Sequence, residues 1–290
     1  MESYNPEHDD KFFPWIKIVG IGETGVSASN YFGDVCNEIF PERLIISSKD
    51  DIDDSRAKIL DFIAGTAWLF AITDIDDLKL AAQVAECIEE SKSLPTARYD
   101  LFDEFKLPLI TFLILCKSAE DARLADIPEN FGTWIILPED KIAECGLTKN
   151  AAIYRTVDMT TSIIPILKKR GNLIGMGFEA ITRTIGNFGR ACVGFGESLD
   201  SENNSLQAVK NALNSSLFIE DIGKAKKALL VFVGKTEFLN MLEMNEAANF
   251  LDKLYQPEDS WDYTLWQVDA DAPFDKDGVA AFVLATKFEK

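Results

Sequence analysis

The stretch NAAIYRTVDMTTSIIPILKK, from Asn150 to Lys169, decides how the rest of this chain is organised. Apolar positions recur in it at steps of four and three residues, which places them on one side of a helix and predicts that this side is buried. Pro165 lacks a backbone donor and clashes with the preceding turn, so we expect the helix to kink there. The predicted buried positions are Ile153, Val157, Thr160, Ile164 and Leu167.

Two charged residues lie off this apolar stripe. Arg155 and Asp158 are three residues apart, so their side chains leave the helix on the same face. They can pair with each other as an ordinary surface ion pair, or they can reach toward a bound ligand. The spacing alone favours the surface pair.

The sequence before this helix alternates between β-rich and helical segments. The alternation predicts an α/β fold with a doubly wound parallel sheet, the architecture of many nucleotide-binding domains. The expected strands are Trp15–Val19, Leu44–Ser48, Trp68–Thr73, Leu109–Leu115 and Thr133–Leu137. The expected helices are Ser27–Ile39, Asp54–Ala64, Leu78–Ser91 and Glu120–Leu124.

The first strand leads into GIGETG, with glycines at Gly20, Gly22 and Gly25, before the first helix. Glycines between a strand and a helix allow backbone amides to approach a phosphate at the positive end of the helix. The same pattern also occurs in a tight turn that packs the helix against the strand. The pattern by itself leaves both interpretations open.

After the central helix the order of expected helices and strands changes, and it predicts a smaller α+β domain. Its last two strands, Thr264–Asp269 and Val279–Thr286, are expected to form an antiparallel hairpin. The other expected elements are helices at Ile181–Arg190, Ser205–Asn214 and Met244–Tyr255 and a strand at Ala228–Gly234. The predicted organisation is a mobile acidic tail (1–14), a nucleotide-type α/β domain (15–149), the central helix (150–170) and the α+β domain (171–290).

Composition narrows the classes of function. The chain has 290 residues, of which 47% are hydrophobic, and this is enough to fill two cores. Its net charge of -19 repels phosphate backbones and anionic membranes, so we expect neither nucleic-acid binding nor direct membrane contact. The only histidine, His8, lies in the predicted tail, which argues against histidine triads and histidine zinc sites.

The five cysteines are odd in number and scattered without a short metal-binding spacing. This usage predicts reduced thiols, a cytoplasmic location and no metal site. The longest apolar run, Leu107–Cys116, is too short to cross a bilayer and is typical of a strand buried on both faces.

Three segments after the central helix resemble, in order and spacing, the second domain of bacterial FtsZ. They are GRACVGFGES (Gly189–Ser198), NALNSSLFIEDIGKAKKALLVFVG (Asn211–Gly234) and MNEAANFLDKLY (Met244–Tyr255). Before them, IKIVGIGETG, WIILPEDKI and IYRTVDM are similar to the first strand and loop, the fifth strand and the start of the central helix of that family. The chain therefore resembles the FtsZ/tubulin family from Ile16 to Phe288.

This resemblance implies a GTP or GDP site in the first domain, with weak binding and Mg²⁺ as an optional ion. Tyr154, Arg155 and Asp158 match the guanine and ribose positions, and a carboxylate such as that of Asp158 can accept two hydrogen bonds from guanine. Glu120 and Arg123 resemble ribose and phosphate contacts, and the glycine loop matches the family's first phosphate loop.

The resemblance fails at the second phosphate loop. After Ala71 the family carries glycines and threonines, whereas this chain reads ITDIDDLKLAAQ, with Asp74, Asp76 and Asp77. Glu23 also stands where the family has glycine. Each carboxylate repels a phosphate by about 1 kcal/mol or more at contact distance, even in a high dielectric. The expected nucleotide site is therefore degenerate.

The loop that follows the central helix has also lost its polar residues. The family places an asparagine and two aspartates there to position the attacking water, whereas this chain has Gly175, Gly177 and Ala180. Glu179 is the only nearby substitute. Loss of such residues costs orders of magnitude in rate, so we expect negligible GTP hydrolysis and no catalytic residues.

Our first interpretation is therefore a cytoskeletal, cell-division-type scaffold similar to FtsZ, which forms filaments or otherwise associates with itself or with another FtsZ-like subunit. No residues follow Lys290, so we expect no tail for membrane-tethering partners. An active or weakly active GTPase that polymerises with GTP is the alternative. A nicotinamide-dependent oxidoreductase built on GIGETG is a remote one, because Ser47 and Ser48 stand where an acid should hold the ribose.

Overall fold

The structure is a computed structural model. It describes residues 16–35, 42–47, 52–64, 66, 68–93, 109–116, 127–128, 130–161, 189–199, 204–235, 238–254, 263–269, 278–286 and 288. The described residues up to 132 form one unit, and those from 133 onward form a second. The domain boundaries at 149 and 170 stay a prediction.

The first unit is built on four parallel strands in the order β2-β1-β3-β4. β1, β3 and β4 are apolar and almost entirely buried, as strands covered on both faces must be. The strands are β1 (Ile16–Ile21), β2 (Glu42–Ile46), β3 (Trp68–Asp74) and β4 (Ile110–Cys116). The predicted parallel sheet is confirmed, and so is the burial of the apolar run over Ile110–Cys116, whereas Leu109 is half-buried and residues 107–108 lie outside the described residues.

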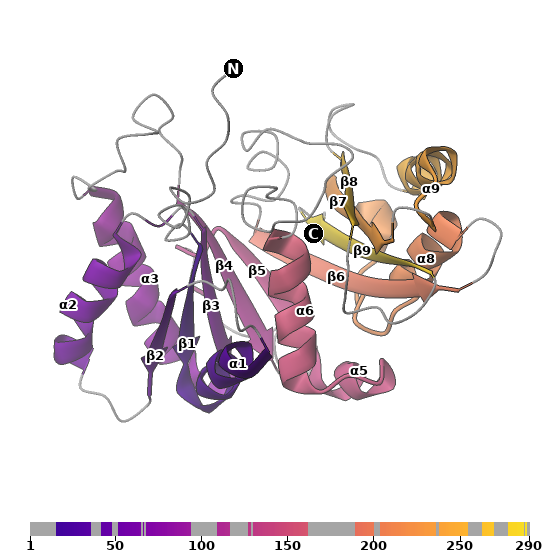
Figure 1. The fold of residues 1–290 in the computed structure, drawn as a ribbon. Coiled ribbons are helices and arrows are strands. Elements are labelled where there is room, and N and C mark those ends of the chain that lie inside the picture. Colours follow the sequence, from indigo (N-terminus) through magenta and orange to yellow (C-terminus); the bar gives the residue numbers. More distant parts are fainter. Residues whose placement is uncertain are drawn as a thin grey trace, which may run out of the picture. The chain divides into compact units, whose positions relative to one another are not determined.

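Helices cover both faces of this sheet, as the prediction of a doubly wound fold requires. α1 (Gly22–Val35) lies on one face, and α2 (Ile52–Ile63) and α3 (Leu78–Ser93) pack together on the other (Figure 1). The single turn η2 (Ile75–Asp77) joins β3 to α3. The ammonium of Lys17, buried in β1, donates to the carbonyl of Phe62 at 2.7 Å and so satisfies the end of α2.

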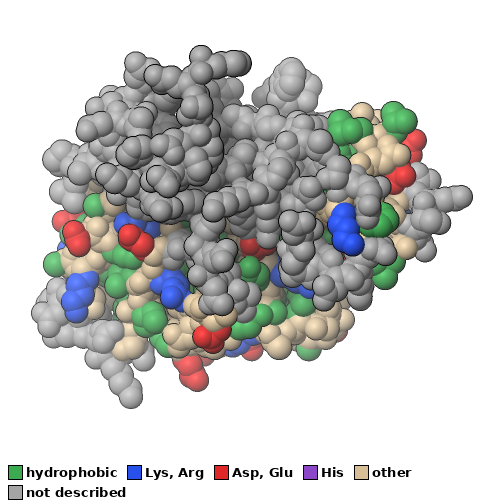
Figure 2. Space-filling view, viewed as in Figure 1, with side chains coloured by type: hydrophobic (Ala, Val, Ile, Leu, Met, Phe, Trp, Pro, Cys, Tyr) green, Lys and Arg blue, Asp and Glu red, His purple; other side chains and the backbone are tan. Residues whose placement is uncertain are grey.

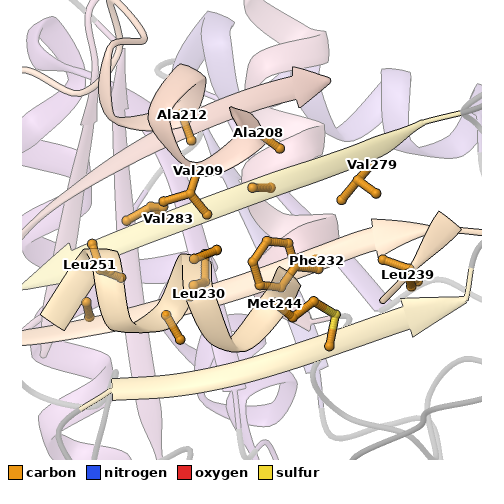
Figure 3. Close-up of a cluster of buried hydrophobic side chains, with 14 residues drawn as sticks. Ala208, Val209, Ala212, Leu230, Phe232, Leu239, Met244, Leu251, Val279 and Val283 are labelled. Atoms are coloured by element: carbon orange, nitrogen blue, oxygen red, sulfur yellow. The ribbon is translucent and has the colours of Figure 1, made fainter. Parts of the chain in front are cut away.

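The second unit has five strands in the order β5-β6-β9-β7-β8. They are β5 (Thr133–Leu137), β6 (Gly189–Ser198), β7 (Lys227–Gly234), β8 (Tyr263–Asp269) and β9 (Val279–Thr286). Its helical elements are α5 (Glu139–Glu144), α6 (Lys149–Thr161), α8 (Asn204–Leu213), the turn η5 (Ile222–Lys224) and α9 (Met241–Leu254). Figure 3 shows its apolar core, in which Phe232 of β7 and Val283 of β9 lie among side chains from α8 and α9.

The predicted final hairpin is wrong. β8 pairs with β7 in parallel, whereas β9 lies between β6 and β7 and is antiparallel to both. All eight residues of β9 are buried, and the sequence VAAFVLAT offers no polar side that could face water. Such a strand needs a neighbour on each edge, so it takes a central position and leaves β8 at the edge of the sheet.

The strand β6 was not expected, and the helix predicted for Ile181–Arg190 is wrong at its end, because Gly189 and Arg190 belong to β6. Glycine is unfavourable in strands, so the glycines of this segment lowered its strand propensity and β6 was not predicted. Its glycines serve a packing purpose. A Cβ at Gly194 or Gly196 would overlap backbone atoms of α8, so only glycine lets this helix lie directly on the strand.

The central helix is confirmed over its described part, α6. Ile153, Val157 and Thr160 of the predicted stripe are fully buried. Ile164, Leu167 and the expected kink at Pro165 lie outside the described residues, as do the predicted tail and the helix predicted for Glu120–Leu124.

Three observations concern the surroundings of the protein. Among the described residues, no helix combines the length and the apolar character that a bilayer crossing requires. No disulfide joins the described cysteines Cys87, Cys116, Cys145 and Cys192. On the face drawn in Figure 2, basic side chains of the described residues lie interspersed with acidic ones.

Candidate functional site

The glycine-rich segment of the first unit is not the loop that the sequence predicted. β1 continues to Ile21 and α1 begins at the next residue, Gly22. Gly22 has a φ of +66°, a left-handed conformation that glycine adopts without strain. This one residue reverses the chain, so that no connecting loop is needed between strand and helix.

The other two glycines hold α1 close to the sheet. A Cβ at Gly20 would overlap the carbonyl oxygen of Gly25 and the hydroxyl of Ser29, and a Cβ at Gly25 would overlap the carbonyl oxygen of Ile72 in β3. Both positions therefore need glycine for close approach of backbone to backbone. Of the two interpretations of GIGETG, the packing turn accounts for Gly20 and Gly25 without any ligand.

Gly22 faces a carboxylate of the chain itself. A Cβ at Gly22 would overlap the carboxylate of Asp77, so this carboxylate lies directly against the Cα of Gly22. The backbone N–H of Glu23, in the first turn of α1, lowers the pKa of this carboxyl and so favours its charged form. The place where a phosphate would meet bare backbone at this helix end is filled by Asp77.

The neighbouring carboxylate of Asp74 accepts hydrogen bonds from two groups of the chain. Thr24, at the start of α1, donates its hydroxyl to Asp74 Oδ2 at 3.0 Å. Asp74 Oδ1 accepts the backbone N–H of Asp76 at 2.9 Å and so caps η2. Asp76 itself is exposed. The three aspartates that replace the family's glycines therefore build a self-contained turn at the carboxyl end of β3.

Burial raises the pKa of Asp77 above the ordinary carboxyl value, and the charges of Asp74, Asp76 and Glu23 raise it further. The hydrogen bond from the Glu23 backbone acts in the opposite direction. The described residues contain no group of three or more acids, cysteines or histidines that is arranged to hold a metal ion.

The predicted nucleoside residues belong to the second unit, on α6. Asp158 is 4% exposed, so the surface pair that its spacing from Arg155 favoured is wrong in placing Asp158 at the surface. Arg155 is half-buried, and its Nη1 lies 3.4 Å from Glu197 Oε1 on β6. Tyr154 is also half-buried. Glu197 is a contact that sequence reasoning missed, because a pairing between separate elements leaves no local signal.

The buried hydroxyl groups of α6 are satisfied within the helix. Thr156 donates to the carbonyl of Ala152 at 2.9 Å, Thr160 to that of Thr156 at 2.6 Å and Thr161 to that of Asp158 at 3.1 Å. Such bonds to the preceding turn are the usual solution for threonine inside a helix. These threonines therefore need no ligand to explain their burial.

The structure thus brings some predicted residues together, and others lie outside the part of the chain that it describes. Gly20, Gly22 and Gly25 gather at the start of α1, and Arg155 and Asp158 share α6 with Tyr154. Glu120, Arg123 and Glu179 lie outside the described residues. Thr24 was missed as the partner of Asp74, because the two residues are far apart in the sequence.

Known proteins similar to this chain include cell-division proteins. Cell division protein FtsZ 1 of Thermococcus kodakarensis is 28% identical over 161 residues, which are 53% of this chain and 41% of the relative. Cell division protein FtsZ of Helicobacter pylori is 30% identical over 152 residues, which are 49% of this chain and 38% of the relative. The match thus spans less than half the length of these relatives. The chain matches no protein-family model.

Solved structures resemble the chain over nearly its whole length. An empty FtsZ dimer of M. jannaschii has a TM-score of 0.69 and 17% identity, and the match covers 98% of this chain and 92% of the other. CetZ2 of Haloferax volcanii, a GTPgS-bound protofilament, has a TM-score of 0.64 and 11% identity over 95% of this chain and 94% of the other. At these identities the likeness shows a shared fold. The chain thus shares the fold of these FtsZ and CetZ structures, and about half of it is similar in sequence to curated FtsZ proteins.

Proposed function

We propose that this protein is an FtsZ-like scaffold of the cytoplasm that associates with itself or with another FtsZ-like subunit, binds GTP or GDP weakly and hydrolyses GTP negligibly. The observation that carries the proposal is the carboxylate of Asp77 against Gly22. The division into a nucleotide-type domain (15–149), a central helix (150–170) and an α+β domain (171–290) is part of it.

The charges around the start of α1 support weak nucleotide binding. A helix N-terminus attracts anions through its free N–H groups, and this attraction is worth roughly 0.3–1 kcal/mol at an exposed site. Here the carboxylate of Asp77 already lies at this helix end, against Gly22, and Asp74, Asp76 and Glu23 add negative charge around it. A triphosphate must overcome this repulsion before it gains any hydrogen bond.

The nucleoside residues also have competing partners. Arg155, expected to contact the nucleoside, contacts Glu197 at 3.4 Å. Both side chains are partly exposed, so this ion pair is weak, and it still reduces what a ligand gains from the guanidinium. Asp158 remains the acceptor for guanine in this proposal. Because Asp158 is buried, its side chain has little freedom to adjust to a ligand.

The assembly part of the proposal is drawn from the relatives. The similar FtsZ is described as a dimer and the similar CetZ2 as a protofilament. A chain that retains their fold over 95% or more of its length retains the framework on which those assemblies are built. Self-association without turnover, in a cell-division-type setting, is therefore the function proposed.

The test is a calorimetric titration of nucleotide-free protein with GTP and Mg²⁺, followed by a phosphate-release assay and sedimentation. We expect binding weaker than micromolar, no phosphate release above background, and association that does not depend on GTP. Turnover comparable to that of an active FtsZ relative would refute the proposal. If that turnover were lost in Glu179→Ala, the active-GTPase alternative would be supported.

A further inference from the structure

We propose that the carboxylate of Asp77 is an internal substitute for a ligand phosphate, which closes the anion position at the N-terminus of α1 by occupying it. The inference rests on the proposed function, because it explains why the nucleotide site is degenerate. It also goes further, since it assigns the closure to one side chain and predicts that removal of that side chain reopens the position to phosphate.

The contact with Gly22 places the Asp77 carboxylate in this position. It lies directly against the Cα of Gly22, where a side chain on Gly22 would overlap it. The backbone N–H of Glu23 lowers the pKa of this carboxyl, which agrees with a first turn that favours negative charge. A glycine that permits close approach and a helix N-terminus that favours an anion are the two features of a phosphate bound at such a turn.

The anion position is made by the backbone and does not depend on the acids. α1 has 14 residues, so its dipole attracts an anion to its N-terminus whether or not Asp77 is present. Gly22, with its φ of +66°, keeps one side of that turn free of any Cβ. Without the Asp77 side chain, this surface would be open to another anion of similar size.

Asp77 is distinct from the two aspartates before it. Asp74 is engaged by the hydroxyl of Thr24 and by the N–H of Asp76, which directs it into η2. Asp76 is exposed, and it contributes charge to the neighbourhood. The overlap at Gly22 involves only Asp77. This difference allows the effect of occupancy to be separated from the effect of charge.

The experiment compares four full-length proteins, wild type, Asp77→Gly, Asp77→Asn and Asp76→Gly, with inorganic phosphate as the probe at constant ionic strength. Asp77→Gly removes both the charge and the occupying group. Asp77→Asn removes the charge but keeps a side chain of the same shape that can accept the Glu23 N–H. Asp76→Gly removes one negative charge nearby and leaves the position occupied.

We expect Asp77→Gly alone to bind phosphate, with a dissociation constant at least about tenfold below that of wild type, which corresponds to about 1.4 kcal/mol. Its melting temperature should be lower than that of wild type, because the helix end loses its acceptor, and phosphate should restore it. Asp77→Asn and Asp76→Gly should bind phosphate no more tightly than wild type does. Asp77→Ala provides the same test if Asp77→Gly does not fold.

The other outcomes contradict the inference in separate ways. If Asp77→Asn binds phosphate as tightly as Asp77→Gly, charge repulsion alone closes the position and occupancy plays no part. If neither Asp77→Gly nor Asp77→Ala gains affinity over Asp76→Gly, the anion position does not exist, and the proposed scaffold function is unaffected. Strong GTP binding and turnover by wild type would instead refute the proposed function.

Discussion

Glycines allow a helix to pack closely on a strand in two regions that are far apart in the sequence. The two regions differ in what covers the remaining backbone. In the first unit, Gly20 and Gly25 bring α1 onto the sheet, and in the second unit Gly194 and Gly196 bring α8 onto β6. Each region has a further glycine with positive φ: Gly22 is buried against the carboxylate of Asp77, whereas nothing lies near the Cβ position of Gly189 on β6. A glycine pattern therefore predicts close packing, whereas ligand binding also needs an uncovered backbone.

The largest expected effect tests the packing side of this comparison. Gly196→Ala should destabilise the protein by about 3 kcal/mol, because its Cβ would overlap the backbone of α8, which cannot move aside easily. Gly223→Ala is the matched control, since its nearest neighbours are 3.2 Å or more away. Urea unfolding measures both. Equal losses in the two variants would contradict the packing role of Gly196.

Gly22→Ala should cost about 2 kcal/mol, less than Gly196→Ala, because it combines strain from the left-handed conformation with a clash that a side chain can relieve. The clash is with Asp77, so the cost should fall when Asp77→Gly is combined with it. A double-mutant cycle of the two changes measures this coupling. Strict additivity would show that Asp77 does not lie against Gly22.

Thr24→Val should destabilise by about 1 kcal/mol, because Asp74 loses a hydroxyl that donates to its carboxylate. Thr160→Val, on α6, is the comparison, since it removes a hydroxyl that bonds only to the preceding turn of its own helix. We expect the second loss to be smaller in thermal unfolding. The reverse order would contradict the assignment of the Asp74 turn as a structural unit.

The smallest expected effects concern two carboxyl groups whose pKa is raised, Asp77 in the first unit and Asp252 in the second. Burial raises the pKa of Asp252, and its Oδ1 is buried without a hydrogen-bond partner. A raised pKa means that the folded state holds the proton more tightly than the unfolded state does. Stability therefore falls as pH rises from the ordinary value of 3.8 through the raised pKa.

Asp252→Asn should accordingly be more stable than wild type at pH 7, by less than about 1 kcal/mol, and the difference should vanish as the pH falls below the ordinary carboxyl range. Asp77→Asn should show the same sign with a smaller gain, since Asp77 has a backbone donor that favours its charged form. Urea unfolding at pH 7 and pH 3.5 measures both. A gain at pH 7 that persists unchanged at low pH would contradict this origin.

Much of the fold was predictable because it depends on local pattern. The apolar runs that became β3 and β4 and the stripe of α6 are each visible in a short window of sequence, and all were expected. The failures came where distant segments decide the outcome. β9 was assigned to a hairpin because it follows β8 in the chain, although its position depends on β6 and β7.

The candidate site shows the same division. The identity of its residues, with aspartates in place of glycines after β3, was readable from the sequence and was enough to predict a degenerate site. The sequence did not indicate which aspartate contacts which backbone group. Asp77 meets Gly22 and Thr24 meets Asp74 across about fifty positions of sequence, and such contacts depend on the register of β1 with β3.

The sequence by itself determined most of the elements, the parallel first sheet and the acidic character of the turn after β3, because propensity, periodicity and charge are properties of neighbouring residues. The tertiary structure alone decided that β9 lies inside its sheet, that Gly20 and Gly25 bring α1 onto the sheet and that Asp77 lies against Gly22. These outcomes depend on steric fit and hydrogen bonding between segments that meet only after the chain has folded.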